Sequence, residues 1–175
     1  MAATEQQLWV FTGSGLWRTL SEVLEDREIR QVEFDPDDEL VVGTDRGLYR
    51  WSDLGIKGQC VSTEISRCVQ NDRFRMTLTW RDFEGRTGRG RWVDIASSES
   101  GMGWFFSANN WEVLAKVING CAFNGSYWVF LAATTNVEFT LTVTDTQTGA
   151  VKTYTNPLGA SAQAVTDIGA FLGCS

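Results

Sequence analysis

Strict alternation of apolar and polar residues is the feature that most limits what this chain can fold into. The segment RFRMTLTW, Arg73–Trp80, places Phe, Met, Leu and Trp at every second position, with Arg and Thr between them. The segment Val137–Thr144 repeats the pattern, with Val, Phe, Leu and Val set against Glu and Thr. Because successive side chains of a β-strand point to opposite faces, this alternation predicts strands that bury one face.

Runs of aromatic and β-branched residues predict further strands in the same part of the chain. These are Gly90–Ile95, Met102–Phe106, Val113–Ile118, Tyr127–Ala132 and Val151–Thr155. The loop after Thr144 ends in Gly149, which suits the left-handed backbone of a hairpin turn. About seven short strands bounded by turn residues predict an all-β fold, an antiparallel β-sandwich of the immunoglobulin-like or fibronectin type III-like kind.

The first fifty residues contain an internal sequence repeat. LWVFTGSGLWRTL, Leu8–Leu20, aligns with LVVGTDRGLYRWS, Leu40–Ser52, at an offset of 32 residues. Each copy predicts a hairpin, because two strand-like runs flank a short turn that contains glycine. The chain therefore divides into a β segment of two hairpins at 1–53, a polar linker at 54–59 and a β-sandwich domain at 60–175.

The second hairpin carries a family likeness. The stretch VEFDPDDELVVGTDRGLYRWSD, Val32–Asp53, resembles one blade unit of a sensor-type β-propeller, and the likeness extends over about residues 7–52. A closed propeller needs at least four blades. The resemblance therefore implies that the strand edges of this segment pair with the rest of a larger protein, with another subunit or with the following domain.

A second likeness covers most of the remaining chain. Its motifs are RFRMTLTWRDFEGRTGRG, GWFFSANNWEVLAKVING, NGSYWVFLAATTNVEFTLTVTDTQTGAVKTYTNPLG and, near the end, Ala170-Phe171. In this order they resemble a C-terminal β module of uncharacterised secreted bacterial proteins, over about residues 68–172. The resemblance implies a secreted β-sandwich, and it implies no known activity.

Charge and hydropathy restrict the partners. The net charge of −7 disfavours binding to nucleic acid or to an anionic membrane, since phosphate groups bind positive surfaces. No apolar run approaches the roughly 20 residues that span a bilayer. The beginning, MAATEQQLWV, lacks the layout of a secretory leader. Either the protein is cytosolic, or it is extracellular or periplasmic with its leader absent from this sequence, and we expect the second.

The four cysteines favour an oxidising compartment. Their even number permits three complete pairings, and no Cys-x-x-Cys motif or histidine accompanies them. The pairing Cys60–Cys68 would close a short loop, and Cys121–Cys174 would join the end of the chain to a mid-chain turn. Two disulfides are the favoured interpretation, and four buried reduced thiols are the alternative.

Catalytic groups are scarce. Without histidine the chain has no Ser-His-Asp or Cys-His arrangement. Paired carboxylates such as glycosidases use remain, and Asp82 with Glu84 is the pair that a weak hydrolase would use. Both residues fall in an expected hairpin loop, where carboxylates are usually solvated. We expect no catalytic residue, no metal and no cofactor.

Aromatic residues are the better candidates for ligand binding. Large aromatic side chains of a sandwich are usually core residues, but those that face outward on one sheet can stack on sugar rings. The candidates are Trp92, Trp104, Trp111, Tyr127 and Trp128. The sequence thus predicts a non-enzymatic secreted module that binds a protein partner or assembles with itself through β edges. The alternative is a carbohydrate-binding module or a weak carboxylate-dependent glycoside hydrolase.

Overall fold

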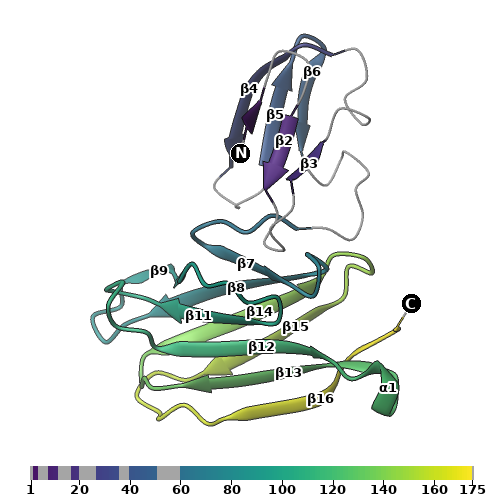
Figure 1. Ribbon diagram of the computed structural model, residues 1–175. Coiled ribbons are helices and arrows are strands. Elements are labelled where there is room, and N and C mark those ends of the chain that lie inside the picture. The colour runs from purple at the N-terminus through teal and green to yellow at the C-terminus, as the bar shows by residue number, and fades with distance from the viewer. Residues whose placement is uncertain are drawn as a thin grey trace.

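The computed structural model describes residues 2–3, 8–11, 17–19, 27–35, 40–50 and 60–174, the first three of these ranges as backbone only. Its described secondary structure is β throughout except for one short helix, and the strand pairs in it are antiparallel. Between residues 66 and 172 the strands form two sheets packed face to face, as Figure 1 shows. The expected all-β sandwich is confirmed.

One sheet is built around the two alternating segments, and we call it the β14 sheet. Its order is β15 (Val151–Asn156), β14 (Glu138–Asp145), β8 (Phe74–Arg81) and β7 (Ser66–Val69), with the short β9 (Thr87–Arg89) also paired to β8. Strands β8 and β14 pair over their full length, so that Leu78 lies opposite Leu141 and Thr77 opposite Thr142. The apolar residues of both strands therefore share the inner face, and their threonines share the outer face.

The other sheet, which we call the β12 sheet, has five strands. Its order is β10 (Arg91–Trp92), β11 (Ser100–Trp104), β12 (Val113–Asn119), β13 (Ser126–Ala133) and β16 (Val165–Leu172). The helix α1 (Cys121–Asn124) connects β12 to β13. The pairing of β13 with β16 shifts register between Tyr127 and Val129, which makes a β-bulge beside Trp128.

The core lies between the two inner faces. Phe74 of β8 packs against Tyr127 of β13 and Phe171 of β16, with ring centroids 4.8 and 5.0 Å apart. Nearer the other end of the sandwich, Phe105 packs against Phe139 at 5.8 Å. Burial of this apolar surface is the main stabilising contribution to such a fold.

The chain crosses from one sheet to the other at Gly90, between β9 and β10. Its amide donates a hydrogen bond of 2.8 Å to the Leu78 carbonyl. A Cβ at position 90 would lie 2.7 Å from the Cβ of Leu78, closer than side chains can approach. Glycine is therefore required at this corner, and its small size allows a single short segment to contribute to both sheets.

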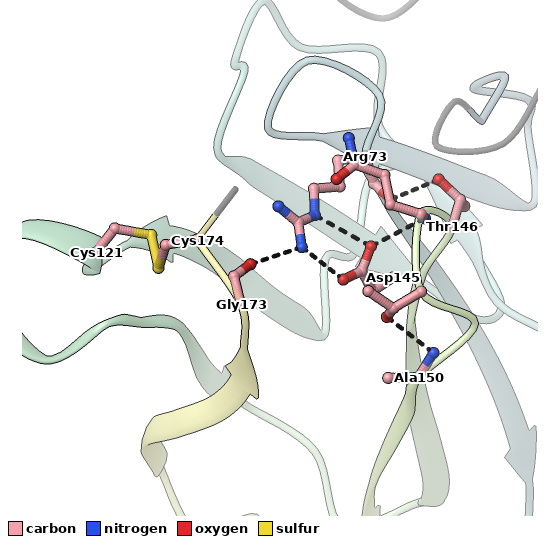
Figure 2. A network of polar contacts seen from close by, with 9 residues as sticks. Arg73, Cys121, Asp145, Thr146, Ala150, Gly173 and Cys174 are labelled. Carbon is pink, nitrogen blue, oxygen red and sulfur yellow. Dashed lines mark hydrogen bonds and ion pairs between the residues drawn. A yellow bond between two sulfur atoms is a disulfide. The ribbon is translucent and has the colours of Figure 1, made fainter.

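A buried ion pair between the ends of β8 and β14 lies at the end of the sandwich that carries α1. The guanidinium of Arg73 donates from Nε and Nη2 to the two carboxylate oxygens of Asp145, at 3.1 and 2.8 Å, and Nη2 also donates to the Gly173 carbonyl (Figure 2). Burial disfavours the charge of Asp145, but its hydrogen bonds from Arg73 and the Gln147 amide hold its pKa below the usual value. The pair therefore stays ionised and links β8 to the chain that follows β16.

All four cysteines form disulfides, and the pairs are Cys60–Cys68 and Cys121–Cys174. The second bond ties α1 to the residue next to Gly173, close to the Arg73–Asp145 pair (Figure 2). Both pairings agree with the favoured interpretation of the sequence. Disulfides persist in oxidising surroundings, so the two bonds indicate an environment other than the reducing cytoplasm.

The N-terminal segment contains two small sheets. In the first, β1 (Ala2–Ala3), β2 (Leu8–Phe11) and β3 (Trp17–Thr19) pair in that order, and in the second so do β4 (Ile29–Phe34), β5 (Leu40–Thr44) and β6 (Gly47–Arg50). The pairs β2–β3 and β5–β6 are the two hairpins expected from the internal sequence repeat. The predicted linker at 54–59 lies outside the described residues.

Each of the seven expected sandwich strands corresponds to a strand of the structure. The sandwich strands that sequence patterning missed are β7, β9 and β16. All four residues of β7 are buried, so it has no alternation, and β16 is interrupted by the bulge opposite Trp128. Period-two analysis finds strands that have one solvated face, and neither of these strands is of that kind.

Candidate functional site

The outer face of the β12 sheet carries an unusual set of apolar side chains. Inward and outward residues alternate along β12 and β13, so the residues between the buried ones face outward. We call the following set the aromatic face: Met102, Trp104, Leu114, Lys116, Ile118, Phe123, Trp128 and Phe130. A sheet face exposed to water normally carries polar residues, so this composition needs an explanation beyond folding.

Cross-strand register makes these residues neighbours. Lys116 lies opposite Phe130, and Ile118 lies opposite Trp128. The ring of Trp128 lies 5.5 Å from that of Phe123 and 6.4 Å from that of Phe130, measured between centroids. The ammonium of Lys116 lies 5.2 Å from the Phe130 centroid, within the range of a cation–π contact. The aromatic face is therefore a continuous surface from α1 to the middle of the sheet.

The indole of Trp128 is held in one orientation. Its Nε1 donates a hydrogen bond of 2.8 Å to Oδ1 of Asn124, whose Nδ2 donates 2.7 Å to the Ile168 carbonyl inside the bulge. A Cβ at position 120 would lie 2.1 Å from the Trp128 ring, so Gly120 lets the indole lie against the backbone. Trp128 is thus fixed before any ligand binds, which reduces the entropy lost on binding.

The helix α1 supports this arrangement and is itself anchored. It contains Cys121, Phe123 and Asn124, and it ends at Gly125, whose φ of 72° is the left-handed conformation common after helices. The bond Cys121–Cys174 fixes the helix to the end of the sandwich. Phe123 nevertheless remains 81 % exposed, and Leu114 in the middle of the sheet is 42 % exposed. The aromatic face is rigid, apolar and accessible.

The sequence candidates divide into three groups. Trp104 and Trp128 lie on the aromatic face, where each is partly buried. Trp92 and Tyr127 are core residues: both face the inner side of the sandwich and are less than a tenth exposed, which leaves little of either ring accessible to a ligand. Trp111 lies elsewhere, in the loop between β11 and β12, and is 50 % exposed.

Sequence reasoning missed Phe123, the most exposed aromatic residue of the face. The run Cys121–Asn124 between two strands was not recognised as a helical turn, and a lone Phe beside a turn has no periodic signal. The alternation of Leu114, Lys116 and Ile118 with buried neighbours was readable as a strand, but it does not tell which face is buried.

The carboxylate pair proposed for a hydrolase has a structural role. Asp82 accepts hydrogen bonds from the amides of Glu84 and Arg86 and from the Arg86 guanidinium, which closes the hairpin loop between β8 and β9. Burial works to raise the pKa of Asp82, but these hydrogen bonds hold it below its usual value. Glu84 is 73 % exposed on the loop surface. This geometry is that of a loop cap, and it gives the hydrolase alternative no support.

Metal-binding groups are equally sparse in the part of the chain that the structure describes. No cluster of three or more cysteine or carboxylate side chains is placed there to hold an ion. The described chain also has no helix with the length and apolarity needed to cross a membrane.

Comparison with known proteins adds no relative. No family model matches the chain, no curated protein matches it in sequence, and no solved structure matches it. The argument for function therefore depends on the chemistry of the surfaces described above.

Proposed function

We propose that this chain is a non-enzymatic binding and assembly module, extracellular or periplasmic, whose aromatic face docks on a protein surface. The observation that carries the proposal is a contiguous apolar row in which Phe123 and Leu114 are exposed. Trp128, Phe130 and Ile118 of this row are partly exposed. Contiguous exposed apolar surface of this kind marks interaction sites in soluble proteins. Tryptophan residues surrounded by apolar neighbours are also the commonest binding hot spots.

The chemistry of the aromatic face favours a protein over a glycan. Aliphatic side chains alternate with the aromatic ones, and the hydrogen-bonding side chains that the register places among them include Ser100, Lys116 and Thr166. Sugars need both stacking rings and several donors and acceptors, whereas a protein surface supplies apolar side chains that pack here. Lys116 on the face and Arg91 beside it each lie over an aromatic ring, and Arg91 also forms an ion pair with Glu64 at 2.9 Å.

A second copy is the partner that the chain itself supplies. Two sheets pack face to face about 10 Å apart when apolar side chains cover the facing sides. A symmetric pair of aromatic faces would meet this condition, because one patch then serves both copies. Packing with the two Lys116 side chains offset leaves each cation over its own Phe130 ring, without close repulsion.

Pairing through strand edges, the route expected from the sequence, is less well supported. The edge strands β15 and β16 belong to different sheets and are joined by a hydrogen bond of 2.9 Å from the Tyr154 hydroxyl to Asp167. Lys152 on β15 and the bulge in β16 are devices that discourage another strand from pairing. We therefore place assembly on the face and not on the edges.

Sedimentation velocity of the oxidised chain, from low to high micromolar concentration, tests this function. The wild type is expected to associate as concentration rises, and Leu114→Glu to remain monomeric because it buries a charge in the interface. Thr79→Glu, which adds the same charge at an exposed position of β8 on the opposite face, is the matched control and should associate like the wild type. A wild type that stays monomeric, or variants that behave alike, would contradict the proposal.

A further inference from the structure

A groove opens at the end of the sandwich opposite α1. Its volume is about 530 Å³, within the range of small-molecule sites. The loops that follow β11, β13 and β15 form its walls, and the aromatic face contributes none of its residues. The groove is thus separate from the proposed protein-docking surface.

The walls of the groove are joined to one another. The amide of Thr134 donates to the Glu112 carbonyl at 2.9 Å, and the amide of Gly159 donates to the Asn136 carbonyl at 2.8 Å. The amide of Ala162 donates to the Thr135 carbonyl at 3.3 Å. Hydrogen bonds between three different loops keep the groove open without a ligand, which makes binding less costly in entropy.

A buried carboxylate forms part of the wall. Glu112 is only 5 % exposed, and its Oε2 accepts from the Phe105 amide at 2.8 Å while Oε1 accepts from Nδ2 of Asn110 at 2.7 Å. Among the described residues no Lys or Arg forms an ion pair with it. Burial raises the pKa of this carboxyl. Each oxygen still has a lone pair that can accept a hydrogen bond from a hydroxyl group of a ligand.

The other polar groups of the groove are neutral. They are the amides of Asn110 and Asn136 and the hydroxyls of Thr134, Thr135 and Ser161. The described lining has no cation, so an anionic ligand would find no partner there. It has one carboxylate, and every other polar side chain of the described lining is neutral. Amides and hydroxyls both donate and accept, as the hydroxyl groups of a sugar do.

An aromatic ring completes the groove. Phe106 lines it and is 49 % exposed, and its ring packs edge-on with that of Trp80 at 4.9 Å, between centroids. Phe105 braces it from the core side at 6.1 Å. A half-exposed ring held in this way can stack on the apolar face of a pyranose.

We propose that this groove binds a neutral carbohydrate, with Phe106 stacking on a sugar ring and Glu112, Asn110 and Asn136 hydrogen-bonding its hydroxyl groups. The inference does not depend on the docking role of the aromatic face, because the two surfaces share no residue. It also differs from the expectation of a tryptophan platform, since the ring that lines this groove belongs to Phe106.

An array of immobilised neutral oligosaccharides, followed by calorimetry with the best of them, tests the inference. The oxidised wild-type chain should bind at least one oligosaccharide of neutral hexoses. Phe106→Ala should weaken that binding about tenfold, the scale of one lost ring contact. Ser161→Arg places a long side chain into the groove from an exposed loop position without touching the core, and should abolish binding.

Leu114→Glu is the matched control, because it disrupts the aromatic face and leaves the groove intact. It should bind the oligosaccharide as the wild type does, whatever its state of association. Circular dichroism confirms that each variant is folded. Binding to no neutral oligosaccharide, binding to acidic glycans alone, or binding that Phe106→Ala and Ser161→Arg leave unchanged would overturn the inference.

Discussion

The two outer faces of the sandwich are built on the same alternation and differ in composition. The outer face of the β14 sheet carries threonine in rows that cross the strands, so that Thr79, Thr140 and Thr155 are aligned, as are Thr77, Thr142 and Thr153. The aromatic face of the β12 sheet carries Trp, Phe, Leu and Ile at the equivalent positions. The outer faces of the β14 and β12 sheets thus share an alternating burial pattern but expose different side chains to solvent.

The difference between the two outer faces indicates which exposed side chains the fold needs. Threonine suits an exposed strand because it is β-branched and its hydroxyl can bond to a neighbour, as that of Thr140 does to Thr155 at 3.1 Å. The β14 sheet shows that such a face is sufficient for this sandwich. We therefore expect the apolar residues of the aromatic face to contribute little to stability, which is why we assign them to binding.

The largest expected effect concerns the buried ion pair between Arg73 and Asp145, whose guanidinium also donates to the chain that follows β16. Asp145→Ala leaves the buried guanidinium of Arg73 without its partner and should lower the free energy of unfolding by about 3–5 kcal/mol. Urea unfolding followed by tryptophan fluorescence measures it. Arg81→Ala, which removes an exposed pair with Glu138, should cost less than about 1 kcal/mol. Equal losses in the two variants would refute the assigned importance of the buried pair.

Removal of the disulfide at α1 should loosen the aromatic face and leave the β14 sheet protected. The double variant Cys121→Ser with Cys174→Ser is expected to lose about 2–4 kcal/mol of stability. Hydrogen exchange should rise in α1 and at the start of β13, which hold Phe123 and Trp128, and stay low in β8 and β14. Uniform loss of protection in both sheets would mean that the bond supports the whole sandwich and not the aromatic face in particular.

A smaller effect is expected from one methyl group added beneath the aromatic face. Gly120→Ala places a Cβ against the Trp128 ring and should cost about 1–3 kcal/mol while shifting the near-ultraviolet circular dichroism of tryptophan. Gly169→Ala is the control, since its Cβ meets open space and its φ is not in the left-handed region. Identical spectra for the two variants would argue against a fixed Trp128.

The smallest expected change in stability tests the comparison between the threonine-rich face and the aromatic face. Leu114→Thr gives the aromatic face one residue of the threonine kind, and it should change the free energy of unfolding by less than about 0.5 kcal/mol. Thermal unfolding in dilute solution, where association is absent, measures the change. A loss of several kcal/mol would show that this side chain serves the fold, and it would remove the basis for assigning the face to binding.

Sequence patterning predicted the sandwich because β8 and β14 have one solvated face each. It could not decide which aromatic residues are exposed. Trp92 and Trp104 both lie in short strands, and only the packing of the sheets places Trp92 inside and Trp104 outside. The groove could not be predicted from the sequence either. Phe106, Glu112 and Asn136 come from different loops, and these loops lie side by side only because of hydrogen bonds between distant segments.

The covalent link between Cys121 and Cys174 also determines how the molecule bears mechanical load. Strands β13, β14, β15 and β16 lie inside the loop that it closes. A pull that enters before Cys121 and leaves after Cys174 passes through the sulfur atoms and bypasses these four strands, so stretching cannot extend them. Reduction would release that hidden chain, and each of its residues could then add about 3.3–3.6 Å of extension.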